Sequence, residues 1–290
     1  MKKVMALVFA MVFALSFGAV AEEFDLSMLT DYVVLPGEKV TLDLDGDGSE
    51  EIFSCDIAYD DANDTETAMV NVIGDGTGAD YLIDMYMANF YVLDINEDGI
   101  YEIFISGDQM SSDYATICLQ FRDGKLLPVL FEDATRGENS EEALYAYGYG
   151  LLMYAGNGIV ELNGSQDILG TYFGSRTFAL QDDMFVLADD GLWHFTRDLM
   201  DEESWEYAGI VPVKDIPVTF VMDGEETEGV IAAGEKFMVI ASDKVSVVQF
   251  IMQDGRAGYF AIEPDTEAGY GVKVNGVNEW ELFENLPYAD

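Results

Sequence analysis

Basic side chains and histidine are scarce in this sequence. The 290 residues include 13 lysines and arginines against 56 aspartates and glutamates, so the formal net charge is −43. A charge of this size repels nucleic acid and anionic lipid, and neither is expected as a partner. The single histidine, His194, is the one residue around which a Ser-His-Asp or Cys-His device could form, and it stands in an aromatic-rich stretch that indicates a structural role.

The usual sequence patterns of catalysis are missing as well. The chain contains no G-x-S-x-G, H-E-x-x-H, C-x-x-C or P-loop pattern, so nucleophilic, zinc and nucleotide chemistry have no visible site. We therefore expect a protein that is not an enzyme. Among 56 acids, however, a pair of carboxylates at glycosidase spacing arises by chance. A calcium-stabilised, glycan-active hydrolase or lyase therefore stays open as the alternative.

Cysteine and long apolar runs are also rare. Cys55 and Cys118 are the only cysteines, and their spacing of 63 residues (118 − 55) does not show whether their side chains meet. Two separate buried thiols are expected, and a disulfide stays open. After residue 21 no apolar run is long enough to span a bilayer. Before it, Lys2, Lys3, an apolar run and the cleavage-type sequence Ala19-Val20-Ala21 predict a signal peptide over residues 1–21, and hence a secreted, extracellular protein.

Apolar and turn-forming residues, in contrast, are plentiful. Half of the residues are apolar and 13% are aromatic, which excludes a disordered acidic tail. Short apolar runs alternate with Asp-Gly and Asn-Gly turns, as they do in β-hairpins. Helical patterns are confined to residues 201–207 and 278–286, and Asn278 is a suitable cap for the second. The sequence therefore predicts an all-β fold.

One acidic stretch occurs twice with the same spacing. LDLDGDGSEEIF at residues 42–53 matches LDINEDGIYEIF at residues 93–104, with an offset of 51 residues (94 − 43). A weaker third copy ends in YAGNGIVELNG and has Met153 and Ala155 in place of the first two acids, and a fourth trace is FVLADDGLWHF. A period near fifty residues in an all-β chain predicts β-propeller-like blades in an array that can be incomplete or irregular.

The repeated stretch places oxygen-bearing residues at alternate positions. Counted from its first aspartate, each copy has oxygen side chains at positions one, three and five, a glycine at six, a backbone carbonyl at seven and a glutamate at nine. Calcium takes six to eight hard oxygens, and the glycine permits the sharp turn that lets them converge. The predicted calcium ligands are Asp43, Asp45, Asp47, Ser49 and Glu51 in the first loop, and Asp94, Asn96, Asp98, Ile100 and Glu102 in the second.

These residues resemble the calcium loops of FG-GAP or VCBS-type repeats, which occur in integrin α-subunit propellers and in many secreted bacterial proteins. The pattern of that family is D-x-[DN]-G-D-G-x-x-D, and the resemblance implies propeller-like blades and bound Ca²⁺ but no single activity. The sequence departs from the pattern in two respects. Glu51 and Glu102 replace the final aspartate, and Glu97 replaces the glycine at position four, which affects the expected number of ligands.

A change of pattern near residue 210 predicts a second domain. Residues 22–210 are expected to form the repeat domain and residues 211–290 a small β-barrel. In the second part, the run Ala233-Gly234-Glu235 and a later Asp254-Gly255 turn followed by Gly258 and Tyr259 resemble bacterial SH3-like barrels. Such modules often bind cell-wall peptide or another protein, which is what this resemblance implies.

The sequence thus predicts a secreted, calcium-binding and non-catalytic protein. Its expected role is that of an extracellular binding or adhesion module for a cell-wall, glycan or protein ligand. Because each loop already supplies about five oxygens, the first expected role of the ions is to rigidify the loops.

Overall fold

The computed structural model describes residues 29, 32–61, 63–74, 76–109, 113–132, 135–136, 146–196, 202–266 and 271–288. Of the described residues, 63% lie in strands and 4% in helices, so the predicted all-β fold is confirmed. The signal peptide predicted for residues 1–21 lies outside the described residues. No helix within the described ranges combines the length and the apolar character that crossing a bilayer requires.

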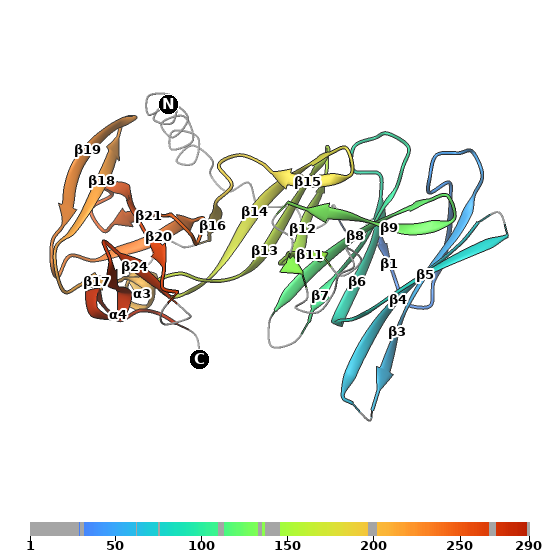
Figure 1. Ribbon diagram of the computed structural model, residues 1–290, viewed down its shortest axis with the longest axis horizontal. Coiled ribbons are helices and arrows are strands. Elements are labelled where there is room, and N and C mark those ends of the chain that lie inside the picture. Colours follow the sequence, from blue (N-terminus) through green and yellow to red (C-terminus); the bar gives the residue numbers. More distant parts are fainter. Residues whose placement is uncertain are drawn as a thin grey trace. The chain divides into compact units, whose positions relative to one another are not determined.

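The chain divides into two compact units (Figure 1). The repeat unit holds the described residues of 23–164 and 177–188, and the C-terminal unit holds those of 165–176 and 189–290. This division differs from the boundary predicted near residue 210, because residues 165–176 and 189–210 group with the C-terminal unit. Strand β16 (Trp193–Phe195) accounts for the difference, since it pairs with Gly174 and Ser175 on one side and with β20 (Phe237–Ser242) on the other.

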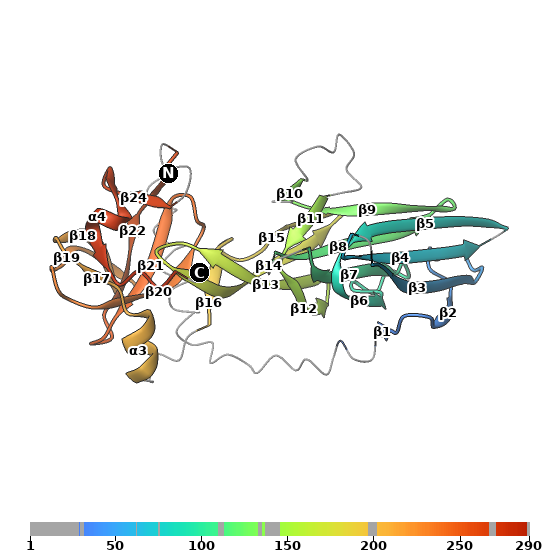
Figure 2. The same cartoon turned by 90° about the horizontal axis from the view of Figure 1, so that it is seen from below.

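The repeats form successive antiparallel meanders of four strands each (Figure 2). The first contains β2 (Lys39–Leu42), β3 (Glu51–Asp60), β4 (Thr65–Gly74) and β5 (Thr77–Asp84). The second contains β6 (Tyr86–Leu93), β7 (Glu102–Asp108), β8 (Tyr114–Arg122) and β9 (Lys125–Phe131). The third contains β12 (Leu151–Gly156), β13 (Ile159–Asp167), β14 (Thr171–Gln181) and β15 (Met184–Leu187). Each of the first three copies of the repeated stretch therefore connects the first strand of its meander to the second, whereas the fourth trace connects β15 to β16.

Short strands extend the second sheet. Strand β1 (Val33–Val34) pairs with β6, and β11 (Ala146–Tyr149) pairs with both β8 and β10 (Thr135–Arg136). No sheet formed by the described residues closes on itself, so the closed propeller and the closed barrel both stay predictions.

The core of the repeat unit lies on both faces of the second sheet. Ile103 and Ile105 of β7 join a buried cluster with Phe53 of the first sheet. Phe104, which stands between them, joins a separate buried cluster with Phe178 of the third sheet. Because side chains alternate along a strand, one continuous apolar run fills two cores, whereas β3 of the first sheet alternates between buried and exposed positions.

The two cysteines lie in different clusters. Cys55 belongs to the first and Cys118 to the second, and both are buried free thiols. The prediction of two separate thiols is therefore confirmed. Burial raises the pKa of Cys55 to about 12, which leaves it without thiolate at neutral pH.

The C-terminal unit is also built mainly from antiparallel strands. Its strands are β16, β17 (Val211–Pro212), β18 (Ile216–Met222), β19 (Glu225–Ile231), β20, β21 (Val247–Met252), β22 (Ala257–Ala261), β23 (Glu263–Pro264), β24 (Val272–Val274), β25 (Val277–Asn278) and β26 (Phe283–Glu284). Strands β19, β18, β22, β21 and β20 pair in that order. Phe237, fully buried, contacts the rings of Phe250, Phe260 and Phe283 at centroid distances of 5.9, 6.0 and 5.7 Å and forms the centre of this core.

The helical predictions are confirmed in part. Helix α3 (Glu202–Ala208) forms where residues 201–207 predicted it. Helix α4 (Glu279–Leu282) begins at the predicted cap, and the Asn278 side chain accepts a hydrogen bond from the Trp280 N–H at 2.9 Å. It ends four residues before the predicted end at residue 286, because Phe283 leaves the helix to pair with Pro212 and to pack on Phe237.

Candidate metal centre

Three carboxylates converge in the first acidic loop. One oxygen each from Asp43, Asp45 and Glu51 lies within 4.8 Å of the other two, and this is the one such group of acids, cysteines or histidines among the described residues. Strand β3 fixes Glu51, which is 2% exposed at the start of the strand, while the loop carries the two aspartates towards it. The structure thus brings together three of the five residues predicted for this loop.

Backbone N–H groups hold the shape of the loop. Asp43 Oδ2 accepts from Gly48 N at 2.9 Å, and Glu51 Oε2 accepts from Leu44 N at 2.8 Å. Asp43 Oδ1, in contrast, is buried and has no hydrogen-bond partner. An all-oxygen group with one such orphaned carboxylate oxygen fits a hard cation such as Ca²⁺, for which this oxygen would be a ligand.

Repulsion between the carboxylates of this loop, together with their burial, disfavours their ionised forms. Burial, together with the neighbouring charges of Asp43 and Asp47, raises the pKa of Asp45 against the lowering effect of one backbone N–H. Burial raises the pKa of Glu51 as well. Both shifts mean that the bare negative charges are unfavourable where they stand, which a bound cation would reverse.

Two predicted residues of the first loop lie outside the convergent group. Asp47 is exposed, and its Oδ1 accepts from Ser49 N at 2.7 Å. Asp47 therefore shapes the turn that follows it, and Ser49 takes part in that turn through its backbone.

The second loop has the same backbone path but a different use of its oxygens. Asp94 Oδ2 accepts from Gly99 N at 2.8 Å and Asp98 Oδ1 from Ile100 N at 2.8 Å, as in the first loop. Asn96 turns its amide towards Asp98, with Nδ2 2.9 Å from Oδ2. No group of three acids converges in the second loop within the described residues, because Asn96 stands where the first loop has Asp45.

Glu102 has both of its oxygens engaged. Oε2 accepts from Ile95 N at 3.1 Å, and Oε1 accepts from Gln120 Nε2 at 2.7 Å. Burial raises the pKa of this fully buried carboxyl to about 6, although both hydrogen bonds lower it. The second loop is therefore closed by protein donors to a greater extent than the first. The sequence did not predict the role of Gln120, because the repeat pattern does not show which residue of the neighbouring strand lies opposite Glu102.

The third copy retains only part of the repeated stretch. Met153 and Ala155 replace the acids, while Asn157 and Gly158 hold left-handed backbone with φ of 52° and 73°. Glu161 nevertheless stays at position nine and is 7% exposed. The sequence already showed that the glutamate at position nine is retained in a copy that lacks the first two acids. Position nine is therefore buried in all three copies, including the copy that lacks the first two acids.

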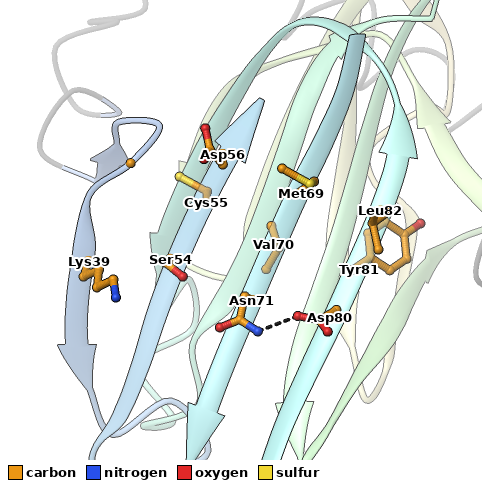
Figure 3. Close-up of a pocket in the computed structure, with 11 residues that line it drawn as sticks. Lys39, Ser54, Cys55, Asp56, Met69, Val70, Asn71, Asp80, Tyr81 and Leu82 are labelled. Atoms are coloured by element: carbon orange, nitrogen blue, oxygen red, sulfur yellow. Dashed lines mark hydrogen bonds between the residues drawn. The ribbon is translucent and has the colours of Figure 1, made fainter. Parts of the chain in front are cut away.

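A hollow of about 550 Å³ lies on the outer face of the first sheet (Figure 3). Its polar centre is a row of residues in register across β2 to β5, namely Lys39, Ser54, Asn71 and Asp80. Asn71 donates a hydrogen bond to Asp80, as the dashed line in Figure 3 marks. The next row contains Asp56, Met69 and Leu82, so the hollow presents charged, amide and apolar groups together.

The comparisons with known proteins give no match. No protein-family model fits the chain, and neither a curated protein nor a solved structure matches it.

Proposed function

We propose that this chain is a secreted, non-catalytic, calcium-binding β-repeat protein that serves as an extracellular binding module. The observation that carries the proposal is the convergence of Asp43, Asp45 and Glu51, together with the buried Asp43 Oδ1, an oxygen with no hydrogen-bond partner. Burying a charged oxygen without a donor or a cation costs free energy that a fold rarely leaves uncompensated. A bound cation removes this cost. The architecture that we propose for the protein is a set of FG-GAP-like blades followed by an SH3-like module.

Calcium suits this loop better than magnesium. Carboxylates and backbone carbonyls of a flexible loop can surround Ca²⁺ at variable angles, whereas Mg²⁺ requires a near-ideal octahedron and retains several waters. The ion would tie the first strand of the repeat to the second, because Asp43 and Asp45 follow β2 and Glu51 opens β3. Its role is therefore to stabilise the repeat unit.

The outer face of the first sheet is the surface that we assign to ligand binding. Leu82, Ile73 and Ile52 are exposed there to 55, 48 and 40%, beside the polar row of the hollow. Exposed apolar groups next to hydrogen-bonding groups are typical of surfaces that bind glycan or protein ligands. Ligand chemistry at this face would need no metal, so calcium would act as a scaffold.

Thermal unfolding with different cations tests the proposal. The protein is melted in EGTA, in excess Ca²⁺ and in excess Mg²⁺, beside the double variant Asp43→Ala/Asp94→Ala. A ligand of the folded state at 100 times its Kd adds about 2.7 kcal/mol of stability, so the midpoint should rise with Ca²⁺ in the wild type but not in this double variant. The control is Glu225→Ala/Glu228→Ala, which removes two exposed acids of β19 and should keep the full calcium effect. An equal rise with Mg²⁺, or in the Asp43→Ala/Asp94→Ala variant, would mean general charge screening and would overturn the proposal.

A further inference from the structure

The residue that follows the position-nine glutamate is apolar in the first three repeats. This position ten is Ile52 in β3, Ile103 in β7 and Leu162 in β13. Ile103 is fully buried in the core between the first and second sheets, and Leu162 is fully buried in the core between the second and third. In both repeats the side chain is therefore covered by the preceding sheet. No sheet precedes that of Ile52 within the described residues, and Ile52 is 40% exposed.

The neighbour of position ten on the next strand shows the same difference. Ile73 pairs with Ile52 in the first sheet, as Leu119 pairs with Ile103 in the second. Leu119 is fully buried, whereas Ile73 is 48% exposed. The outer face of the first sheet thus corresponds to the face of the second sheet that the first one covers. Terminal repeats of stacked arrays normally turn a polar face to solvent, so an apolar pair at this place indicates a surface that another sheet covers.

The next row of the same face is polar in the first sheet. Ile105 and Ile117 pair in the second sheet, and both are buried against the first. The equivalent pair in the first sheet is Ser54 and Asn71. Polar side chains of this kind stay hydrated in the free protein, whereas two isoleucines would require permanent cover. The mixture of apolar and polar rows therefore fits an interface that forms and separates reversibly.

The outer face contains three successive rows that run across its strands, of which Figure 3 draws the second and the third. Neighbouring rows are about 6.8 Å apart, because each step along a strand covers two residues. An extended chain lying along these strands has the same spacing between its alternate residues, so apolar, basic and apolar side chains at i, i+2 and i+4 would meet one row each. The rows are Thr41, Ile52, Ile73 and Gly78; Lys39, Ser54, Asn71 and Asp80; and Asp56, Met69 and Leu82.

The charged residues of this face are mainly acids. Asp56, Asp80 and Asp84 are exposed on β3 and β5, beside the exposed Lys39 of β2. A sheet packed on this face would lie about 10 Å away, within reach of a lysine or arginine side chain. A second copy of this chain would instead bring the same acids together across the contact, and each copy has a net charge of −43. A basic partner is therefore favoured over self-association.

We propose that the outer face of the first sheet binds a β-sheet of another, basic protein, whose covering face alternates apolar and basic side chains. The proposal rests on the proposed function, because it names the ligand class of the surface assigned to ligand binding. The described residues of these rows contain no aromatic ring on which a sugar could stack, so a protein is favoured over a glycan. Binding would give the first sheet the cover that the second and third sheets already have.

A cationic β-hairpin tests the proposal. The probe is a disulfide-closed hairpin peptide with valine and lysine in alternation on one face, and its control is the same hairpin with glutamate in place of lysine. Each is titrated by NMR into the isotope-labelled protein at about 0.15 M salt, which limits general electrostatic attraction to about 8 Å. We expect the lysine hairpin to bind, with amide shifts concentrated in β3, β4 and β5, and the glutamate hairpin to show no binding.

The apolar row is tested by Ile73→Thr. Ile73 is exposed and threonine keeps the β-branched shape, so the fold should be retained. Loss of apolar contact should weaken the binding of the lysine hairpin by about 5-fold. The control is Val230→Thr, which makes a similar exchange at a valine of β19 that is 44% exposed, and it should leave the affinity unchanged.

The acids are tested by Asp80→Asn/Asp84→Asn. Loss of two exposed charge pairs should weaken the binding of the lysine hairpin by about 3-fold or more. The control is Glu225→Gln/Glu228→Gln, which removes the same charge from exposed positions of β19 in the C-terminal unit and should leave the affinity unchanged.

Several outcomes would overturn the proposal. Equal losses in a variant and its control, or equal binding of the two hairpins, would mean that binding does not depend on this face or on its charge. Absence of binding by the lysine hairpin would overturn the proposal as well. Self-association of the free protein that Ile73→Thr abolishes, measured by sedimentation, would make a second copy the occupant in place of a basic partner.

Calcium binding is judged separately, by the melting midpoint. A rise of the midpoint with Ca²⁺ beside a failed hairpin titration would overturn the interface alone. An unchanged midpoint beside hairpin binding at β3, β4 and β5 would overturn the calcium-binding function and leave the interface in place.

Discussion

Glu97 adopts the same left-handed backbone in the second loop as Gly46 adopts in the first, with φ of 60° and 72°. In both acidic loops, position four therefore has a positive φ, whether glycine or glutamate stands there. Glutamate has a Cβ and gains no local hydrogen bond that would favour this conformation, so the second loop carries backbone strain that the first does not. The departure from the family pattern that the sequence showed at Glu97 is thus accommodated at a cost in stability.

Replacing this glutamate should stabilise the protein. Glu97→Gly removes the strain, and the greater freedom of glycine in the unfolded chain offsets part of the gain, so we expect an increase of about 0.5 kcal/mol in the free energy of unfolding. Urea unfolding in EGTA measures it. Glu50→Gly is the control, because Glu50 is an exposed acid of the first loop without positive φ. An equal gain in the control would mean that loss of charge, and not relief of strain, stabilises the variant.

The glutamate at position nine should have separable roles in the repeats. Glu161→Ala removes a buried acceptor from a copy without acidic ligands, and we expect a loss of about 1–3 kcal/mol in the free energy of unfolding with no change in the number of bound calcium ions. Glu51→Ala should cost a similar amount, because it leaves Leu44 N without its partner, and should also remove one ion. Urea unfolding and equilibrium dialysis with Ca²⁺ measure the two effects. Loss of an ion in Glu161→Ala would show that the third copy is a metal site.

The convergence of three acids in the first loop could be predicted from the sequence because it depends on local spacing. Asp43, Asp45 and Glu51 lie within nine residues of one another, and the glycines that turn the chain stand between them. Gln120 was not predictable in this way, since it reaches Glu102 from a neighbouring strand. The end of α4 and the division of the chain likewise depend on distant pairings, that of Phe283 with Pro212 and that of β16 with β20. Such pairings follow from tertiary packing, which repeat spacing does not reveal.

The aromatic core of the C-terminal unit should depend strongly on Phe237. Truncating a fully buried ring that contacts three other phenylalanines removes apolar burial and leaves a cavity, so Phe237→Ala should lower the free energy of unfolding by about 3–5 kcal/mol. The matched control is Phe173→Ala, because Phe173 is 53% exposed and should cost far less. Urea unfolding followed by tryptophan fluorescence measures both. Similar losses in the two variants would contradict the packing described for this unit.

A buried carboxyl in α4 should make stability depend on pH. Glu279 is fully buried, and burial raises its pKa, with a further contribution from Asp265 and an opposing one from the Tyr288 hydroxyl that donates to Oε1 at 2.8 Å. The folded state therefore binds the proton more tightly than the unfolded state, whose glutamate pKa is about 4.3. The stabilisation is complete below this value and is lost as pH rises through the folded-state pKa.

Glu279→Gln should remove this dependence. We expect the free energy of unfolding of the variant, relative to the wild type, to increase from pH 4 towards pH 7, by about 1.4 kcal/mol for each tenfold difference in proton affinity between the folded and unfolded states. Urea unfolding of the variant and the wild type across this pH range measures the difference in their free energies of unfolding. The effect of the large net negative charge is common to both proteins and cancels in this difference.

Asp243 provides a control of opposite sign. Burial raises its pKa, but the Ser246 hydroxyl and the N–H groups of Val245, Ser246 and Val247 outweigh this effect and lower it. The stability that Asp243 contributes is therefore present above the unfolded pKa of about 3.9 and is lost as pH falls. Asp243→Asn should be less stable than the wild type at pH 7, by an amount that shrinks towards acid pH. A pH-independent difference for Glu279→Gln beside the expected trend for Asp243→Asn would show that the Glu279 carboxyl has the same proton affinity in the folded and unfolded chain.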